Sequence, residues 1–205
     1  MLKSKQLGRD FFSRNTLQVA SGLLGKRLVR VEDGQRLGGI ICEVEAYRGE
    51  ADQACHARAG WTNRTRVMYG QPGHAYVYFT YGQHWMLNFV TEEEGYPAAV
   101  LIRAILPVEG LETISARRAK VPAPRWTDGP AKLCQALGID GRQNGVDLCA
   151  EEAEIFVEQG QAIDPGGITL GHRVGLNNVP EPWKSMPWRF LIKTVDGHKR
   201  IDTKG

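Results

Sequence analysis

The segment Glu43-Val-Glu45-Ala-Tyr47 places two carboxylates directly after an apolar run. Side chains of a β-strand alternate between its two faces, so Glu43, Glu45 and Tyr47 are expected to share one face. An ionisable acid would then lie beside an aromatic ring, a setting suited to acid–base chemistry. Two solvated acids on an edge strand would have the same sequence, so both interpretations stay open for this segment.

A second candidate is the aromatic run Tyr76-Val-Tyr78-Phe-Thr-Tyr81-Gly82. Alternation directs Tyr76, Tyr78 and Thr80 to one face of the expected strand. Buried tyrosine hydroxyls need hydrogen-bond partners, and most aromatic strands belong to a core. Tyr81, however, falls where the strand turns, and we expect it to protrude.

Arg103 interrupts the apolar run 98–106. A guanidinium in such a strand needs a carboxylate or several carbonyl groups as partners. Glu43 and Glu45 are the natural acids, because they belong to a neighbouring expected strand. The resulting ion pair could carry chemistry, or it could be purely structural.

Positioning these residues requires a sheet, and the hydrophobic pattern predicts one. Strands are expected at 26–32, 36–44, 75–81, 85–91, 98–106, 155–157 and 189–194. Asp33-Gly34 is typical of a hairpin turn between the first two, which puts Glu45 at or just past a strand end. The strands between residues 75 and 106 are expected to form a meander.

Helices are expected at 16–24 after the cap Asn15, at 111–120, and at 131–137 after Pro130. Segment 49–73 is expected to be a long loop around a short helix near 51–57, and 164–187 a second Gly/Pro-rich loop. No repeat or linker divides the sequence. We therefore predict one domain spanning 1–205, of the α+β class, with a mostly antiparallel curved β-sheet and peripheral helices.

The composition is that of a globular protein: 42% of the 205 residues are hydrophobic and 24% are charged, which excludes a disordered or collagen-like chain. No stretch approaches the ~18 apolar residues of a membrane span. The N-terminal segment carries Lys3, Lys5 and Arg9 but no apolar region, so we expect no secretory signal and an intracellular protein. The four widely spaced cysteines are expected to be free thiols, and zinc-ligand spacing is missing.

Basic residues are unevenly distributed, although the net charge is only +3. Residues 1–40 hold eight basic and three acidic side chains, and Arg117, Arg118, Lys120 and Arg125 form a second basic cluster. Such clusters can neutralise nucleic-acid phosphates, or they can be an ordinary solvated surface. The charge permits a DNA partner without requiring one.

Motifs in a fixed order cover nearly the whole sequence. They are Leu23-Leu-Gly-Lys26, Glu43-Val-Glu45-Ala-Tyr47-Arg-Gly49, Asp52 with Ala54 and His56, Pro72-Gly73, Tyr76-Val-Tyr78, Tyr81-Gly82, Asn88, Leu101-Ile-Arg103-Ala, Gly129-Pro-Ala-Lys-Leu-Cys-Gln-Ala-Leu137, Arg173-Val-Gly175 and Pro187-Trp-Arg-Phe190. Together they resemble the alkyladenine DNA glycosylase family, the 3-methyladenine DNA glycosylases that lack a helix-hairpin-helix.

This resemblance implies a role for each matching residue. Glu45 matches the general base that deprotonates a water attacking the sugar of a flipped nucleotide. Arg103 and the main-chain carbonyl of Val174 match the groups that hold this water. Tyr81 matches the side chain inserted into the gap left by the base. The base pocket is matched by Tyr47, His56, Tyr78 and Asn88, the last of which crowds the exocyclic amine of unmodified guanine.

The resemblance also implies a substrate and a partner. Arg64 and Lys132 match contacts to the DNA backbone. The implied protein is a monofunctional, monomeric glycosylase that starts base excision repair on double-stranded DNA containing alkylated or deaminated purines, with neither a metal nor a cofactor. The main alternative is a protein of the same fold that binds damaged DNA without excision, and a third reading is an RNA-binding or scaffold protein.

Some positions depart from the family pattern. Val44 stands where the family often has threonine, and Gln83-His84-Trp85-Met86 replaces a more apolar stretch after the turn. Asn63-Arg64-Thr65 is a loose version of the family's Thr-x-Arg-Asn motif. These departures leave the implied catalytic set complete.

Overall fold

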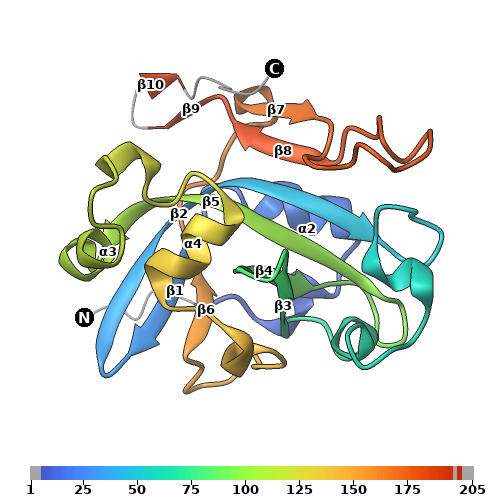
Figure 1. The fold of residues 1–205 in the computed structure, drawn as a ribbon, viewed down its shortest axis with the longest axis horizontal. Coiled ribbons are helices and arrows are strands. Elements are labelled where there is room, and N and C mark those ends of the chain that lie inside the picture. Colours follow the sequence, from blue (N-terminus) through green and yellow to red (C-terminus); the bar gives the residue numbers. More distant parts are fainter. Residues whose placement is uncertain (1–5, 196–197, 200–205) are drawn as a thin grey trace.

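The structure is a computed structural model that describes residues 6–195 and 198–199, so Lys3 and Lys5 lie outside the described part. One antiparallel sheet organises the chain (Figure 1). Its path is β3-β4-β5-β2-β1-β6, with β8 beside β2 and β7 beside β8. The strands are β1 (Arg27–Glu32), β2 (Gln35–Arg48), β3 (Ala75–Thr80), β4 (His84–Val90), β5 (Ala98–Glu109), β6 (Ile155–Glu158), β7 (Ile168–Gly171) and β8 (Arg189–Ile192), and β9 (Thr194–Val195) pairs separately with β10 (His198–Lys199).

Short helices surround this sheet (Figure 1). The α-helices are α1 (Arg9–Phe12), α2 (Thr16–Leu23), α3 (Leu111–Arg117) and α4 (Pro130–Leu137), and the 3-10 helices are η1 (His56–Ala59), η2 (Arg66–Tyr69), η3 (Ala123–Arg125), η4 (Gly141–Gln143) and η5 (Pro165–Gly167). Asn15 caps α2 by accepting a hydrogen bond from Leu17 N–H at 3.0 Å. Within the described residues, the helices are too short to cross a lipid bilayer. The predicted α+β class with its antiparallel sheet is confirmed.

The hairpin of β1 and β2 and the meander β3-β4-β5 also agree with the sequence. The expectation that Glu45 ends its strand is wrong, because β2 continues to Arg48 by pairing with β5. Strand β7 lies where the sequence predicts a loop, and it pairs with β8. The short helix near 51–57 lies instead at His56–Ala59, and α3 ends at Arg117.

The central strands present different chemistry to their two faces. Val44, Leu87, Phe89 and Ile102 belong to the main apolar core, against which α2 and α4 pack. Burying each such side chain contributes roughly 1.5–3 kcal/mol. The opposite face carries a smaller apolar cluster under η1 and η2, which is Cys55, Ala57, Met68, Tyr76, Val90 and Ala99. Glu45 and Arg103 extend from this second face.

Strand β2 is shared by three neighbours. One edge pairs with β5, and the other pairs first with β1 and then with β8. Gly38 and Gly39 lie where the neighbours approach: an added Cβ would be 2.3 Å from Leu28 O at Gly38 and 2.2 Å from Leu106 O at Gly39. The register of β2 against β5 shifts between these two residues. Because neighbouring backbone lies so close, glycine is required at both positions.

We therefore expect Gly39→Ala to reduce the free energy of unfolding by at least ~2 kcal/mol, because the methyl group would displace paired backbone. Urea denaturation followed by circular dichroism measures this change. Gly166→Ala is the matched control, since an added Cβ there meets nothing within 4 Å. Equal denaturation midpoints for the two variants would contradict the expectation.

Candidate active site

A pocket of about 510 Å³ opens on the second face of the sheet. Nine of the ten residues proposed from the sequence line it, and they come from β2, β3, β4, β5, η1, α4 and the two loops 81–83 and 172–188. They are Glu45, Tyr47, His56, Tyr78, Tyr81, Asn88, Arg103, Lys132 and Val174. The tenth, Arg64, lies outside, with its guanidinium 4.9 Å from the Tyr78 ring centroid.

The carboxylate of Glu45 has no solvent exposure and receives donors from three separate segments of the described chain. Tyr47 O–H donates to Oε2 at 2.8 Å. Val174 N–H donates to Oε1 at 2.7 Å, and Arg103 Nη1 lies 3.2 Å from the same oxygen. The acid therefore lies beside an aromatic ring, as strand alternation predicts.

Burial raises the pKa of Glu45 above its ordinary value, because the ionised form loses its hydration. The charge of Arg103 and the hydrogen bonds from Val174 and Tyr47 oppose this rise, and the charge of Glu43 adds to it. A carboxylate with a raised pKa is a stronger proton acceptor than an exposed one. The site can thus hold a reactive base as long as its donors stay in place.

The second carboxylate has a different setting. Glu43 Oε1 lies 2.7 Å from Arg103 Nε and 2.9 Å from Arg189 Nε. Arg103 therefore bridges both acids. This agrees with the prediction that an arginine in an apolar strand needs an acidic partner. Glu43 is held between two guanidinium groups, whereas Glu45 is the acid that lines the pocket.

Aromatic rings form the wall above these charges. His56 meets Tyr78 edge to face at a centroid distance of 4.5 Å, and His56 Nδ1 lies 3.0 Å from Tyr76 O–H. Asn88 is buried and donates from Nδ2 to Tyr76 O at 3.0 Å. Burial, followed by the charges of Arg64 and Arg58, lowers the pKa of His56 to about 4. The wall is therefore uncharged at neutral pH.

Tyr81 stands at the β3–β4 turn, where Gln83 N–H donates to Thr80 O at 3.2 Å. Its φ is +52° and its side chain is 84% exposed, so this large ring projects beside the pocket. Lys132 lies at the rim on α4 and forms an ion pair with Asp128 at 2.6 Å. The protrusion that the turn position predicts is present.

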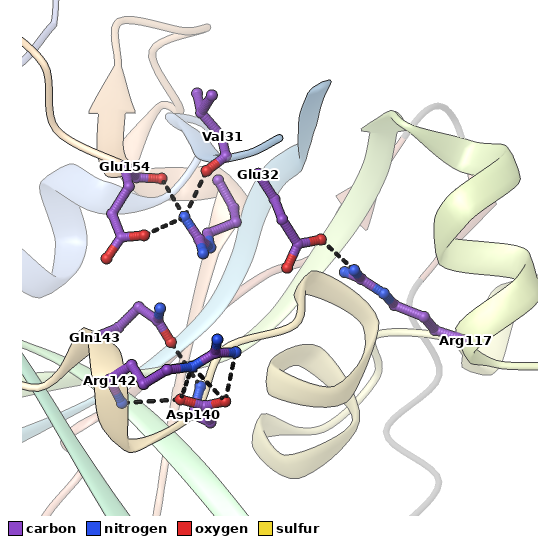
Figure 2. Close-up of polar contacts among 8 residues, drawn as sticks. Val31, Glu32, Arg117, Asp140, Arg142, Gln143 and Glu154 are labelled. Atoms are coloured by element: carbon purple, nitrogen blue, oxygen red, sulfur yellow. Dashed lines mark hydrogen bonds and ion pairs between the residues drawn. The ribbon is translucent and has the colours of Figure 1, made fainter. Parts of the chain in front are cut away.

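The basic cluster around residue 117 is largely partnered. Arg117 contacts Glu32, a contact that Figure 2 shows together with those of Asp140, Arg142 and Gln143. Arg118 contacts Gln135 and Arg125 contacts Asp128. The structure therefore gives this cluster ordinary surface partners.

The sequence did not reveal one buried pair next to the pocket. Arg173 and Asp52 both have fully buried side chains and form an ion pair at 2.5 Å. They are 121 positions apart, and neither stands in an apolar run of the kind that drew attention to Arg103. Their only sequence signal is that each falls within one of the ordered motifs.

Among the described residues, no three His, Cys, Asp or Glu side chains are grouped so that they could hold a metal ion. The cysteines of this part of the chain are free thiols, as expected. Burial raises the pKa of Cys55 and of Cys134 to about 12, so these thiols stay protonated.

Comparison with related sequences identifies the family to which this chain, with its antiparallel sheet and aromatic pocket, belongs. The chain belongs to the methylpurine-DNA glycosylase family, whose model matches residues 10–196. It is 50% identical over 188 residues to a protein of Methanocella arvoryzae named "Putative 3-methyladenine DNA glycosylase", covering 91% of this chain and 92% of that protein. Proteins with the same name from Chlorobaculum parvum and Clostridium acetobutylicum are 44% and 45% identical, covering 92% of this chain and 88% and 94% of theirs. The resemblance seen in the motifs is therefore confirmed.

The low pKa of His56 predicts a loss of stability in acid. An unfolded histidine binds its proton below about pH 6.5 while folded His56 stays neutral to about pH 4, so the unfolded state gains stability as the pH falls through this window. The resulting loss in the free energy of unfolding is at most ~3 kcal/mol. Melting temperatures of wild type and His56→Gln from pH 7 to pH 4 should diverge, with wild type falling more steeply. His84→Gln, at an exposed position, should fall with wild type.

Proposed function

We propose that this protein hydrolyses the N-glycosidic bond of alkylated purines in duplex DNA. The observation that carries the proposal is the buried Glu45 carboxylate at the base of an aromatic pocket, held by donors from three segments. Membership in the methylpurine-DNA glycosylase family supports the reaction class. We further propose that the protein acts as a monomer within the cell and begins base excision repair.

Access to the bond requires base flipping. A glycosidic bond inside stacked DNA is out of reach of Glu45, so the nucleotide must rotate out at a cost of a few kcal/mol. An inserted side chain offsets part of this cost by filling the gap. Tyr81 fits this role, because its ring is exposed at a turn beside the pocket.

The flipped base would lie against Tyr47 and Tyr78. A pocket of about 510 Å³ is within the usual range for a small aromatic ligand. An alkylated ring nitrogen gives the base a positive charge, which favours contact with electron-rich rings. Buried Asn88 would crowd the exocyclic amine of guanine and so disfavour that base.

The chemical step uses a water held by Arg103 and the carbonyl of Val174. Glu45 accepts a proton from this water as its oxygen bonds to C1′ of the sugar. The C1′–N bond breaks and its electron pair leaves with the base. An ionised Glu45 also stabilises the positive charge that develops on the sugar. The reaction is balanced without any further reactant.

A binding protein without activity is the alternative. Recognition alone needs an aromatic pocket and an exposed wedge, but it does not need a carboxylate buried at a cost of several kcal/mol. The Glu45–Arg103 pair therefore favours an enzyme.

Release of free base from a methylated duplex tests the proposal. We expect Glu45→Gln to lower single-turnover release by about 10²-fold or more, because an amide cannot accept the proton. The variant should still fold, because glutamine has nearly the same shape and Arg103 keeps its ion pair with Glu43. Glu43→Gln should have the milder effect on release. Near-normal release by Glu45→Gln would refute the role of Glu45, and no release by the wild type would refute the proposed activity.

Tyr81→Ala should leave the free energy of unfolding within ~0.5 kcal/mol of wild type, because the side chain is exposed. Base release should slow, and the loss should be smaller when the damaged base faces a mismatch, where flipping is already easier. Tyr81→Phe keeps the ring and should behave like wild type. Equal losses on paired and mispaired substrates would remove Tyr81 from this role.

A further inference from the structure

We propose that the buried ion pair of Arg173 and Asp52 is the positioning element of the general base. It would fix the two uncharged donors that hold Glu45, namely Val174 N–H and Tyr47 O–H. The inference rests on the proposed function of Glu45, and it assigns Arg173 and Asp52 a positioning role without contact to the substrate.

The geometry of the pair is bidentate and closed. Arg173 Nη1 and Nη2 donate to the two Asp52 oxygens at 2.5 and 2.9 Å. The same nitrogens donate to Ala46 O at 3.0 Å and Trp183 O at 3.1 Å. Such fork-like pairing fixes the orientation of a guanidinium as well as its position. Arg173, which lies in the loop 172–188, therefore connects this loop to Ala46 of β2 and to Asp52, and it also binds Trp183 further along the same loop.

Stability alone is a weak reason for this pair. Two fully buried charges lose their hydration, and apolar residues of similar size stabilise a fold equally well or better. The described structure also leaves Arg173 Nε without a hydrogen-bond partner. The arrangement is therefore better explained by what the guanidinium holds in place.

The first link to Glu45 runs through the backbone. Val174 directly follows Arg173, and its N–H donates to Glu45 Oε1 at 2.7 Å. The Val174 side chain is 36% exposed, and Gly175 follows with φ at +82°. Packing of Val174 itself thus gives little anchorage, so the buried side chain of Arg173 holds this N–H in place.

The second link runs through ring stacking. The guanidinium carbon of Arg173 lies 4.7 Å from the centroid of Tyr47 and 5.0 Å from that of Trp188. Tyr47 in turn donates its hydroxyl hydrogen to Glu45 Oε2 at 2.8 Å. Each oxygen of the carboxylate is therefore bound by a group whose position depends on Arg173.

Asp52 links the ion pair to the pocket that would hold the flipped base. Its Oδ1 accepts from Ala54 N–H at 3.0 Å and its Oδ2 accepts from Arg48 N–H at 3.2 Å. These bonds shape the turn that leads from β2 into η1, which carries His56. The ion pair thus connects the turn before η1 with the loop 172–188, whose Val174 N–H binds the general base Glu45.

Displacing the two donors should alter the acidity of Glu45. Both hydrogen bonds lower its pKa against the effect of burial, so weakening them raises the pKa further. The charged or titratable groups that face this carboxylate are Arg103 from β5, Glu43 and Tyr47 from β2, and Tyr78 from β3, with Arg189 of β8 bound to Glu43. Since the ionised form is the active base, the acid limb of the rate profile should move to higher pH.

The test compares Arg173→Lys with a matched control. Lysine keeps the charge but loses the bidentate, planar contact. Arg30→Lys is the control, because Arg30 is also buried, ion-paired to Glu154, and left with an unpartnered Nε. Figure 2 shows the contacts of Glu154 and Val31 there, in a region apart from the pocket lining.

We expect Arg173→Lys to lower single-turnover base release by about tenfold or more, as for small misplacements of reacting groups. The acid limb of its rate profile should shift upward, while affinity for the damaged duplex changes little. Asp52→Asn should shift the limb in the same direction, which covers the case in which one variant folds poorly. Arg30→Lys should keep the wild-type profile per folded molecule.

A double variant separates positioning from simple destabilisation. In the Glu45→Gln background, Arg173→Lys should cause no further loss of residual release, because the group it positions is gone. Additive losses, or a wild-type rate profile for Arg173→Lys, would overturn the inference. A wild-type protein that releases no base would instead overturn the proposed function.

Discussion

The burial of one carboxyl group, Glu45, is the constraint on which the rest of the structure depends. Glu45 is removed from water on a sheet whose other face is a tightly packed apolar core. An unpaired charge in such a place costs several kcal/mol, so the fold has to supply partners. Arg103, Tyr47 and Val174 supply them from β5, β2 and the loop 172–188. These three segments meet at the Glu45 carboxylate.

Strand β2 meets the requirement because it is shared. Its glycines at 38 and 39 let β1 and β5 approach, and the register shifts beyond them. Past this point β8 replaces β1 at the strand's edge, so the acids of β2 face arginines from two directions. Glu43 is neutralised between Arg103 and Arg189, which leaves Glu45 as the acid that lines the pocket.

The two faces of the sheet divide stability from chemistry. Apolar side chains of β2, β4 and β5 pack with α2 and α4, and this face supplies most of the hydrophobic stabilisation. The opposite face holds buried charges, a wall of aromatic rings and an open pocket, and a protein selected for stability alone would not need them. The chain belongs to the methylpurine-DNA glycosylase family, and the pocket is where we propose that the reaction occurs.

The sequence by itself determined a great deal of this molecule. Strand alternation predicted Glu45 beside Tyr47, the apolar run around Arg103 required an acidic partner, and the turn after Thr80 predicted an exposed Tyr81. These inferences succeed because each depends on local periodicity or on the cost of burying a charge. The order of motifs indicated the family.

Only the tertiary structure decided the features that depend on distant pairing. Strand β2 extends past its apolar pattern by continuing to pair with β5, and β7 pairs with β8, which follows it after a long loop. The contact between Val174 and Glu45 joins residues 129 positions apart, and that between Arg173 and Asp52 spans 121. No local pattern encodes such contacts, because they arise from how loops close over the finished sheet.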